Sequence, residues 1–213
     1  MTTSQTSPAR PPPPSFTLTY PPSLESYNTP ASTWLATHNK TWDGLATAAL
    51  VFSPANRILL LQRAAHDSMP NLWETPGGAA DAEDASLFAA CARELWEEAG
   101  LTATRIVRVV TEGAYREPGS VFTNRTGKIF FCRFAFEVEV ETKEGEVEGA
   151  VRIDPEEHQD FVWATEEEVR AGRVGDKEIP ATNGQMMRII LDGFRRRREE
   201  AAEAVEGRSE ARR

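Results

Sequence analysis

The stretch PGGAADAEDASLFAACARELWEEAGL, residues 76–101, joins a glycine turn to an amphipathic helix. Asp84 can cap the N-terminus of this helix, with helical backbone from near Ala85, because a short polar side chain satisfies the first free amides. Gly100 stands where a helix ends, since glycine readily adopts the left-handed C-cap conformation. At about 100° per residue, one side of the helix is apolar and is expected to be buried. That side carries Phe88, Cys91, Ala92, Leu95 and Ala99.

Three carboxylates, those of Glu94, Glu97 and Glu98, border the apolar side at i, i+3 and i+4. Like charges at this spacing repel by about a few tenths of a kcal/mol per pair. Arg93 can neutralise one charge, and a divalent cation is the simplest recipient for the others. Oxygen ligands alone suit Mg²⁺ or Mn²⁺ rather than Zn²⁺. A solvated acidic helix face is the alternative, but the Gly-Gly turn favours a ligand site because glycine permits close backbone approach.

These residues resemble the Nudix box, whose pattern is Gly, five residues, Glu, seven residues, then Arg-Glu-apolar-x-Glu-Glu-x-Gly-apolar. The segment Arg93–Leu101 matches this pattern at every position. Upstream, Asp84 replaces the first Glu, and eight residues rather than seven separate it from Arg93, so the loop is expected to be one residue longer. The resemblance covers about Trp42 to Phe194. The matching positions are Gly78, Arg93, Glu94, Glu97, Glu98 and Gly100.

Composition and charge narrow the classes of partner. The chain has 213 residues, 40% of them hydrophobic, and a formal net charge of −9. This charge argues against binding nucleic acid or a membrane surface, which would need a basic patch, but a bound metal could still attract a phosphorylated substrate. No apolar run approaches the ~20 residues of a transmembrane helix, and no signal-peptide pattern is present. Cys91 and Cys132 are expected to be reduced core thiols, which predicts a cytoplasmic location.

Composition also divides the chain into three parts. Residues 1–31 are rich in Ser, Thr and Pro and are predicted to be a disordered tail. Residues 32–198 are predicted to form one Nudix hydrolase domain, and residues 199–213 a charged C-terminal tail. Within the segment from Pro30 to Lys40, a short helix is expected to pack Trp34 onto the core.

The periodicity of the middle part predicts an α/β fold. Strands are expected at residues 46–52, 57–63, 103–112, 128–140 and 161–163. The first two are expected to form a hairpin, and residues 113–126 a polar loop. A capping box at Thr165 and Glu168 begins a short helix, and a last helix follows Asn183. This order fits a mixed β-sheet with helices on both faces, as the resemblance to the Nudix α/β/α sandwich also implies.

Four side chains outside the helix are candidates for binding substrate. Arg63 ends a strand at a place where an arginine of the Nudix family often faces the substrate, and a surface arginine is the alternative. Trp73 precedes the glycine turn in a segment that can touch the base in this family, although a core position is the alternative. Arg116 and Arg125 lie in the long polar loop, and arginine offers bidentate donors to phosphate.

The resemblance implies a Nudix-type pyrophosphohydrolase acting on phosphorus-containing acid anhydrides. The reaction would cleave the pyrophosphate link of a nucleoside diphosphate joined to another group X. Glu94, Glu97, Glu98 and the carbonyl of Gly77 would hold Mg²⁺, with Mn²⁺ as the alternative. Arg93 would hold a glutamate in orientation.

A further carboxylate is expected from the loop before the last strand. Glu157 is the candidate, with Glu156 next, and a solvated acidic loop is the alternative. The general base is one of the box glutamates or a residue such as Glu157, and the sequence leaves this choice open.

Two other functions stay open at this point. The first is a non-catalytic Nudix-fold nucleotide-binding or regulatory protein, and the intact segment Arg93–Leu101 argues against it because non-catalytic versions usually lose a glutamate. The second is hydrolysis of capped RNA, and the acidic charge argues against it. The expected partner is a small nucleotide substrate, with no nucleic acid and no membrane, and a homodimer is left open.

Overall fold

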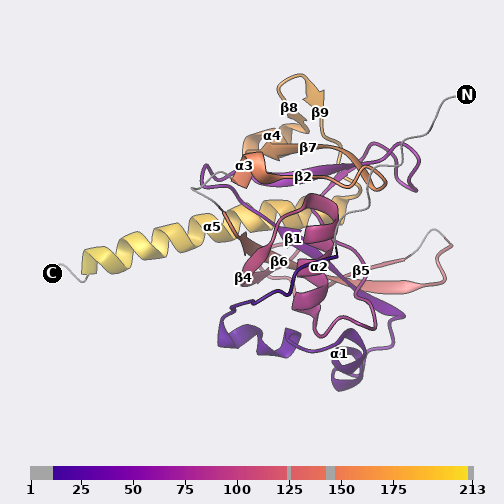
Figure 1. The fold of residues 1–213 in the computed structure, drawn as a ribbon. Coiled ribbons are helices and arrows are strands. Elements are labelled where there is room, and N and C mark those ends of the chain that lie inside the picture. The colour runs from indigo at the N-terminus through magenta and orange to yellow at the C-terminus, as the bar shows by residue number, and fades with distance from the viewer. Residues whose placement is uncertain (1–11, 124–125, 143–146, 211–213) are drawn as a thin grey trace, which may run out of the picture.

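A four-stranded mixed sheet forms the centre of the molecule (Figure 1). The computed structural model of the protein describes residues 12–123, 126–142 and 147–210. Strand β6 is parallel to β1 and antiparallel to β4 and β5. The strands are β1 (Gly44–Leu50), β4 (Ala103–Val110), β5 (Ser120–Thr123) and β6 (Phe130–Val140).

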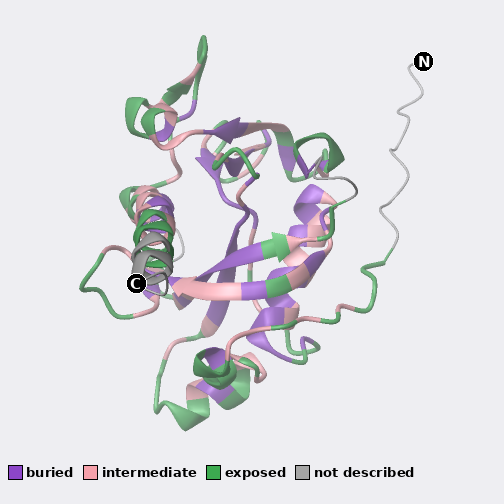
Figure 2. Ribbon diagram, turned by 90° about the vertical axis from the view of Figure 1, so that its left-hand side faces the viewer, coloured by how far each residue is buried: buried purple, intermediate pink, exposed green. Residues whose placement is uncertain are grey.

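A second, antiparallel sheet lies beside the first and has the order β3-β2-β7. Its strands are β2 (Ile58–Arg63), β3 (Trp73–Glu74) and β7 (His158–Ala164). Strands β8 (Arg173–Val174) and β9 (Lys177–Glu178) form a separate small hairpin, which is mostly exposed in Figure 2.

Helices cover both sides of the strands, which confirms the predicted α/β/α sandwich. They are α1 (Ala31–Thr37), α2 (Leu87–Ala99), α3 (Val147–Ala150), α4 (Glu166–Ala171) and α5 (Gly184–Glu210). Helix α2 packs into one hydrophobic cluster and α5 into another, so the two helices lie on opposite faces. None of the helices in the described ranges is long and apolar enough to cross a membrane.

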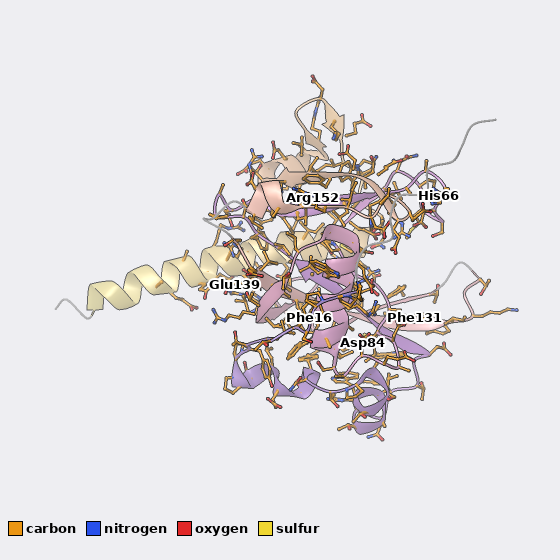
Figure 3. The ribbon with its side chains drawn as sticks, in the orientation of Figure 1. Phe16, His66, Asp84, Phe131, Glu139 and Arg152 are labelled. Carbon is orange, nitrogen blue, oxygen red and sulfur yellow. The ribbon has the colours of Figure 1, made fainter. Side chains whose placement is uncertain are left out.

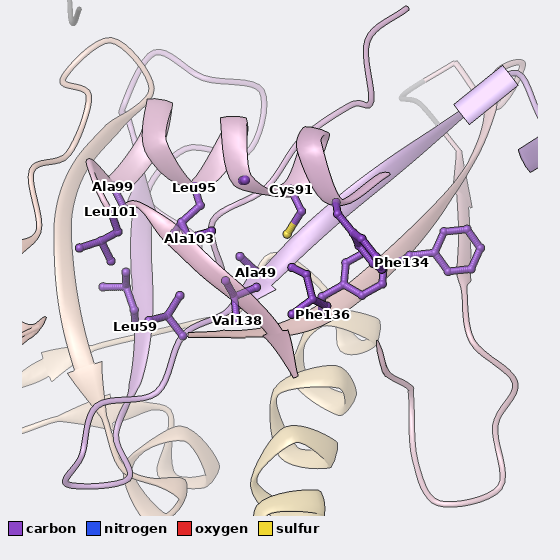
Figure 4. Close-up of a cluster of buried hydrophobic side chains, with 14 of the residues drawn as sticks. Ala49, Leu59, Cys91, Leu95, Ala99, Leu101, Ala103, Phe134, Phe136 and Val138 are labelled. Atoms are coloured by element: carbon purple, nitrogen blue, oxygen red, sulfur yellow. The ribbon is translucent and has the colours of Figure 1, made fainter. Parts of the chain in front are cut away.

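The α2 cluster contains the apolar side that the sequence predicted. Cys91, Leu95 and Ala99 point from α2 onto strand residues such as Phe136 and Val138 (Figure 4). The predicted cap is wrong by two residues, because the Ser86 hydroxyl accepts from the Ala89 amide and the helix begins at Leu87. The predicted end is confirmed, with Gly100 at a φ of +70°.

The predicted hairpin between the first two strands is confined to the residues next to its turn, where the Leu59 amide donates to the Val51 carbonyl at 3.0 Å. Strands β1 and β2 are joined by a tight turn with one bridge, between Phe52 and Ile58, and then enter different sheets. Strand β5 was also missed within the predicted loop of residues 113–126, because its four residues are too short to show a clear period. The predicted capping box is confirmed by both hydrogen bonds between Thr165 and Glu168.

The predicted N-terminal tail extends too far into the chain. Residues 1–11 lie outside the described residues, but Leu24 is only 6% exposed within a 3-10 helix at Pro22–Tyr27. The Tyr20 ring lies 5.0 Å from that of Phe88 on α2. A few well-spaced aromatic and aliphatic side chains thus dock a segment whose overall composition is typical of disorder. At the other end, α5 continues to Glu210, so the predicted charged tail begins inside a helix.

The docked segment gives a direct prediction. A chain that begins at residue 32 is expected to be at least about 3 kcal/mol less stable than one that begins at residue 12, because burial of one leucine or aromatic side chain contributes ~1.5–3 kcal/mol. Urea unfolding of both chains measures the difference. Equal free energies of unfolding would show that residues 12–31 are a tail after all.

Candidate functional site

The glycine turn runs along the edge of β1 that does not pair with β6. The amide of Thr47 donates to the Gly78 carbonyl and that of Ala49 to the Pro76 carbonyl, each at 2.8 Å. Because successive carbonyls of extended backbone point to opposite sides, the carbonyl of Gly77 points away from β1. Gly77 has a φ of +149°, and a Cβ there would lie 2.2 Å from the Thr47 carbonyl oxygen. Only glycine fits this position.

Both glycines bring the turn close to the carboxylates of α2. The Gly77 amide donates to Oε2 of Glu98 at 2.7 Å. A Cβ on Gly78 would lie 2.7 Å from the carboxyl atoms of Glu94. The turn therefore holds the Glu98 carboxylate by a hydrogen bond from Gly77. The absence of a side chain on Gly78 leaves room for the Glu94 carboxylate.

Arg93 joins the turn to the helix. Its guanidinium binds both oxygens of Asp84, at 3.0 and 2.9 Å, and the Ala79 carbonyl at 2.9 Å. Nη1 donates to Glu94 at 2.9 Å and to Glu97 at 2.8 Å. Asp84 thus fills the position of the first glutamate in the Nudix box as a bidentate partner of this arginine.

The carboxylates of the box differ in burial. The side chain of Glu97 is 38% exposed and that of Glu94 is 13% exposed, whereas Glu98 is buried at 4%. Burial raises the pKa of Glu94 to about 7 against the opposing effect of Arg93. Burial also raises the pKa of Glu98 well above its ordinary value, opposed by the Gly77 amide and reinforced by neighbouring carboxylates. When Glu94 and Glu98 are both ionised, the positive charge near them does not balance their negative charge.

The loop before β7 also lies next to the carboxylates of α2. Backbone hydrogen bonds from Arg152 to Ala99 (2.8 Å) and from Asp154 to Glu98 (3.2 Å) attach this loop to the end of α2. As a result, ligand atoms of Glu98, Glu157 and His158 lie within 4.8 Å of one another. Glu157 therefore lies close to Glu98, and its role at the site stays a prediction, whereas the sequence gave no reason to single out His158.

The predicted substrate-binding residues have different outcomes. Trp73 takes the core position that was the alternative, because it is 1% exposed and packs in the α5 cluster. Arg63 is held by Asp67 at 2.5 Å and also by Glu74, and its contact with substrate stays a prediction. Arg116 is exposed between β4 and β5. Arg125 lies outside the described residues.

A stacked aromatic pair adjoins the cluster. The rings of Phe122 and Phe131 are 5.8 Å apart at 21°, and the guanidinium of Arg133 lies 4.7 Å from the Phe122 centroid. Burial lowers the pKa of Arg133, and the carboxylates of Glu74 and Glu98 oppose this effect, so this arginine lies near them. Figure 3 shows Phe131 near the start of β6. Sequence reasoning missed these residues, although a charged residue within the apolar run FFCRFAF was a usable indication.

The donor set fits a divalent cation. Carboxylates of Glu94, Glu97, Glu98 and Glu157 supply hard oxygen ligands, and the carbonyl of Gly77 can supply another. Bringing several carboxylates together in a buried place costs free energy unless a cation balances them.

Comparison with known proteins identifies the family of this chain. The family model described as the NUDIX domain matches residues 42–183, and the chain belongs to this family. The MutT protein from Methanosarcina mazei Go1 is 22% identical, with 73% of this chain and 94% of that chain covered and a TM-score of 0.51. The E. coli ORF135 protein is 23% identical, with 72% and 90% covered and a TM-score of 0.52.

A third similar structure is the NUDIX domain of Shewanella oneidensis NrtR, solved as a complex with ADP ribose. It is 17% identical, with 78% of this chain and 97% of that chain covered and a TM-score of 0.52. At these identities the three structures establish the shared fold. A search of curated proteins gave no match.

The burial of Glu98 leads to a pH-dependent prediction. Its folded-state pKa is raised, so its ionisation destabilises the metal-free chain above the ordinary pKa of 4.5. Glu98→Gln should therefore stabilise the chain in EDTA at pH 7.5 by roughly 1 kcal/mol or more, and by much less at pH 4.5. Urea unfolding at both pH values measures the change. The control Glu83→Gln, at an exposed carboxylate, should stay within about 0.5 kcal/mol. A Glu98→Gln variant that is destabilised at pH 7.5 would contradict the prediction.

Proposed function

We propose that the protein is a divalent-metal-dependent hydrolase that cleaves the pyrophosphate link of a nucleoside diphosphate joined to a group X. The observation that carries this proposal is the carboxylate cluster at the end of α2, where Glu98 accepts from the Gly77 amide and lies close to Glu157 and Glu94. Membership of the NUDIX family supports the reaction class. Mg²⁺ is the proposed metal, with Mn²⁺ as the alternative.

Water attacks one phosphorus of the pyrophosphate, and the bond from that phosphorus to the bridging oxygen breaks. The products are a nucleoside monophosphate and phosphorylated X. A carboxylate of the cluster takes the proton of the water, and Glu94, Glu97 and Glu157 are the candidates. A bound divalent ion would shield the phosphate charge and lower the pKa of the water.

Arg93 is a positioning residue in this scheme. Its contacts with Glu94 and Glu97 limit the rotamers of both carboxylates, while its contacts with Asp84 and Ala79 tie them to the glycine turn. Preorganised ligands contribute to catalysis because they do not have to be rearranged during the reaction.

The aromatic pair is proposed to bind the nucleobase. Phe131 covers Gly44, where a Cβ would lie 2.6 Å from its ring, so the small residue makes room for the aromatic side chain on this face. Arg133 next to the pair offers a cation toward the phosphates. The nucleotide would then extend from the rings to the carboxylates.

The experiment is a substrate screen with the full chain in Mg²⁺ and Mn²⁺. Nucleotide sugars, dinucleoside polyphosphates, NADH, ADP-ribose, oxidised dNTPs and capped RNA are the compounds to compare. ADP-ribose is a natural first choice, because the structurally similar NrtR domain was solved with it. Binding without turnover for every compound would favour the non-catalytic nucleotide-binding alternative.

Glu97→Gln tests the carboxylates. With a substrate from the screen, kcat is expected to fall by at least about 100-fold, because loss of metal stabilisation in the transition state costs several kcal/mol. The fold should persist, since Arg93 keeps Asp84 and Glu94 as partners. Steady-state kinetics measure the loss, with Glu83→Gln as the control. Unchanged kcat in Glu97→Gln would refute the catalytic role of the cluster.

Phe131→Leu tests the aromatic pair. KM is expected to rise about fivefold or more with little change in kcat, because one aromatic contact contributes ~1 kcal/mol to binding. The matched control is Phe130→Leu, since Phe130 is 45% exposed and points to the other face of β6. Equal effects of the two substitutions would place the nucleobase elsewhere.

A cytoplasmic location and a homodimer stay predictions. Cys91 and Cys132 are both free and buried.

A further inference from the structure

We infer that His158 is a nitrogen ligand of the metal, so that the site combines oxygen and nitrogen donors. This inference rests on the proposed function, because it concerns the same metal site. It differs from the oxygen-only set that the helix carboxylates predict.

The imidazole of His158 is buried without a hydrogen-bond partner. The residue is 1% exposed, and neither Nδ1 nor Nε2 has a partner in the described structure. Buried polar atoms are nearly always paired, and an unpaired one costs free energy of about 1–3 kcal/mol. A metal ion would satisfy one of these nitrogens.

The backbone holds His158 firmly in this place. Its amide donates to the Asp154 carbonyl at 2.8 Å, and it is paired with Arg63 where β7 meets β2. Asp154 in turn donates to the carbonyl of Glu98. The histidine is therefore fixed relative to α2 through the same loop that carries Glu157.

The distances fit a shared ion. One ligand atom each from Glu98, Glu157 and His158 lies within 4.8 Å of the others. Ligands bound at about 2.0–2.3 Å lie roughly 3 to 4.5 Å apart around one ion, so small side-chain adjustments suffice. Glu74 Oε1 lies 3.8 Å from Nε2 of His158, which is too far for a hydrogen bond.

An imidazolium counter-ion to the carboxylates is the competing explanation. A charged histidine in that role would donate short hydrogen bonds, and charge-assisted bonds of this kind are about 2.7–2.9 Å long. The 3.8 Å separation from Glu74 and the two unpaired nitrogens favour the metal ligand instead.

A nitrogen ligand changes the metal preference. Imidazole suits the later transition metals, whereas Mg²⁺ prefers oxygen and retains water ligands. The site should therefore bind Co²⁺ and Mn²⁺ more tightly than Mg²⁺, and His158 should account for much of the Co²⁺ preference.

Calorimetric titration of the full chain with Mg²⁺, Mn²⁺ and Co²⁺ tests the inference. Co²⁺ is expected to bind at least tenfold more tightly than Mg²⁺. His158→Gln should weaken Co²⁺ binding at least tenfold and Mg²⁺ binding less than threefold, because an amide oxygen can still serve Mg²⁺ (about 10–100-fold losses are typical of changes around a metal site). The matched control is His66→Gln, at an exposed histidine, which should leave all three affinities unchanged. Equal losses for Co²⁺ and Mg²⁺, or none for Co²⁺, would overturn the inference.

A second measurement needs no variant of His158. The chain has three histidines, and the ring proton of a histidine bound to Co²⁺ gives a strongly shifted NMR resonance. This resonance should appear in the Co²⁺-loaded parent and persist in His38→Gln and in His66→Gln. Its absence from the parent, or its loss in either variant, would overturn the inference.

These results are separable from the proposed function. Hydrolysis in Mg²⁺ together with unchanged Co²⁺ binding in His158→Gln would overturn the nitrogen ligand and leave the hydrolase. Co²⁺ binding through His158 without turnover of any screened compound would do the reverse.

Discussion

The contacts of Arg93 hold the glycine turn, the helix and the carboxylates in one arrangement. Its guanidinium is shared among Asp84 and Ala79 on the loop side and Glu94 and Glu97 on the helix side. A planar group with five donors can make these contacts at once, which a lysine cannot. The longer loop of this chain is compatible with the site because Asp84 still reaches the arginine with both oxygens.

The site also requires the backbone of the glycine turn to lie close to the carboxylates of α2. Gly77 and Gly78 lie where any Cβ would collide with Thr47 or with Glu94. The amide of Gly77 then becomes the partner of the buried Glu98. Sheet pairing sets this geometry, because the turn is hydrogen-bonded along β1. The site therefore depends on the central sheet as much as on the helix.

Local patterns predicted what depends on local spacing. The apolar side of α2, the end at Gly100 and the capping box at Thr165 all follow from neighbouring residues, and all agree with the structure. The pairing of β1 with β6 depends on contacts between distant segments, so the chain order suggested a hairpin with β2 instead. His158 and Arg133 were missed for the same reason, since each gains its significance from residues far away in sequence. Trp73 shows that a residue close to the glycine turn in sequence can still be buried in the core.

Without a metal ion, the close carboxylates cost free energy, and this explains why helix α2 has to be packed firmly against the sheet. Burial raises the pKa values of Glu94 and Glu98, which means that their ionised forms are unfavourable where the fold holds them. The apolar side of α2 offsets this cost, because Phe88, Cys91 and Leu95 are almost fully buried against the sheet. A flexible helix would move the carboxylates apart and relieve their repulsion. The packing prevents this, and the repulsion that remains becomes part of the free energy that a divalent cation gains on binding.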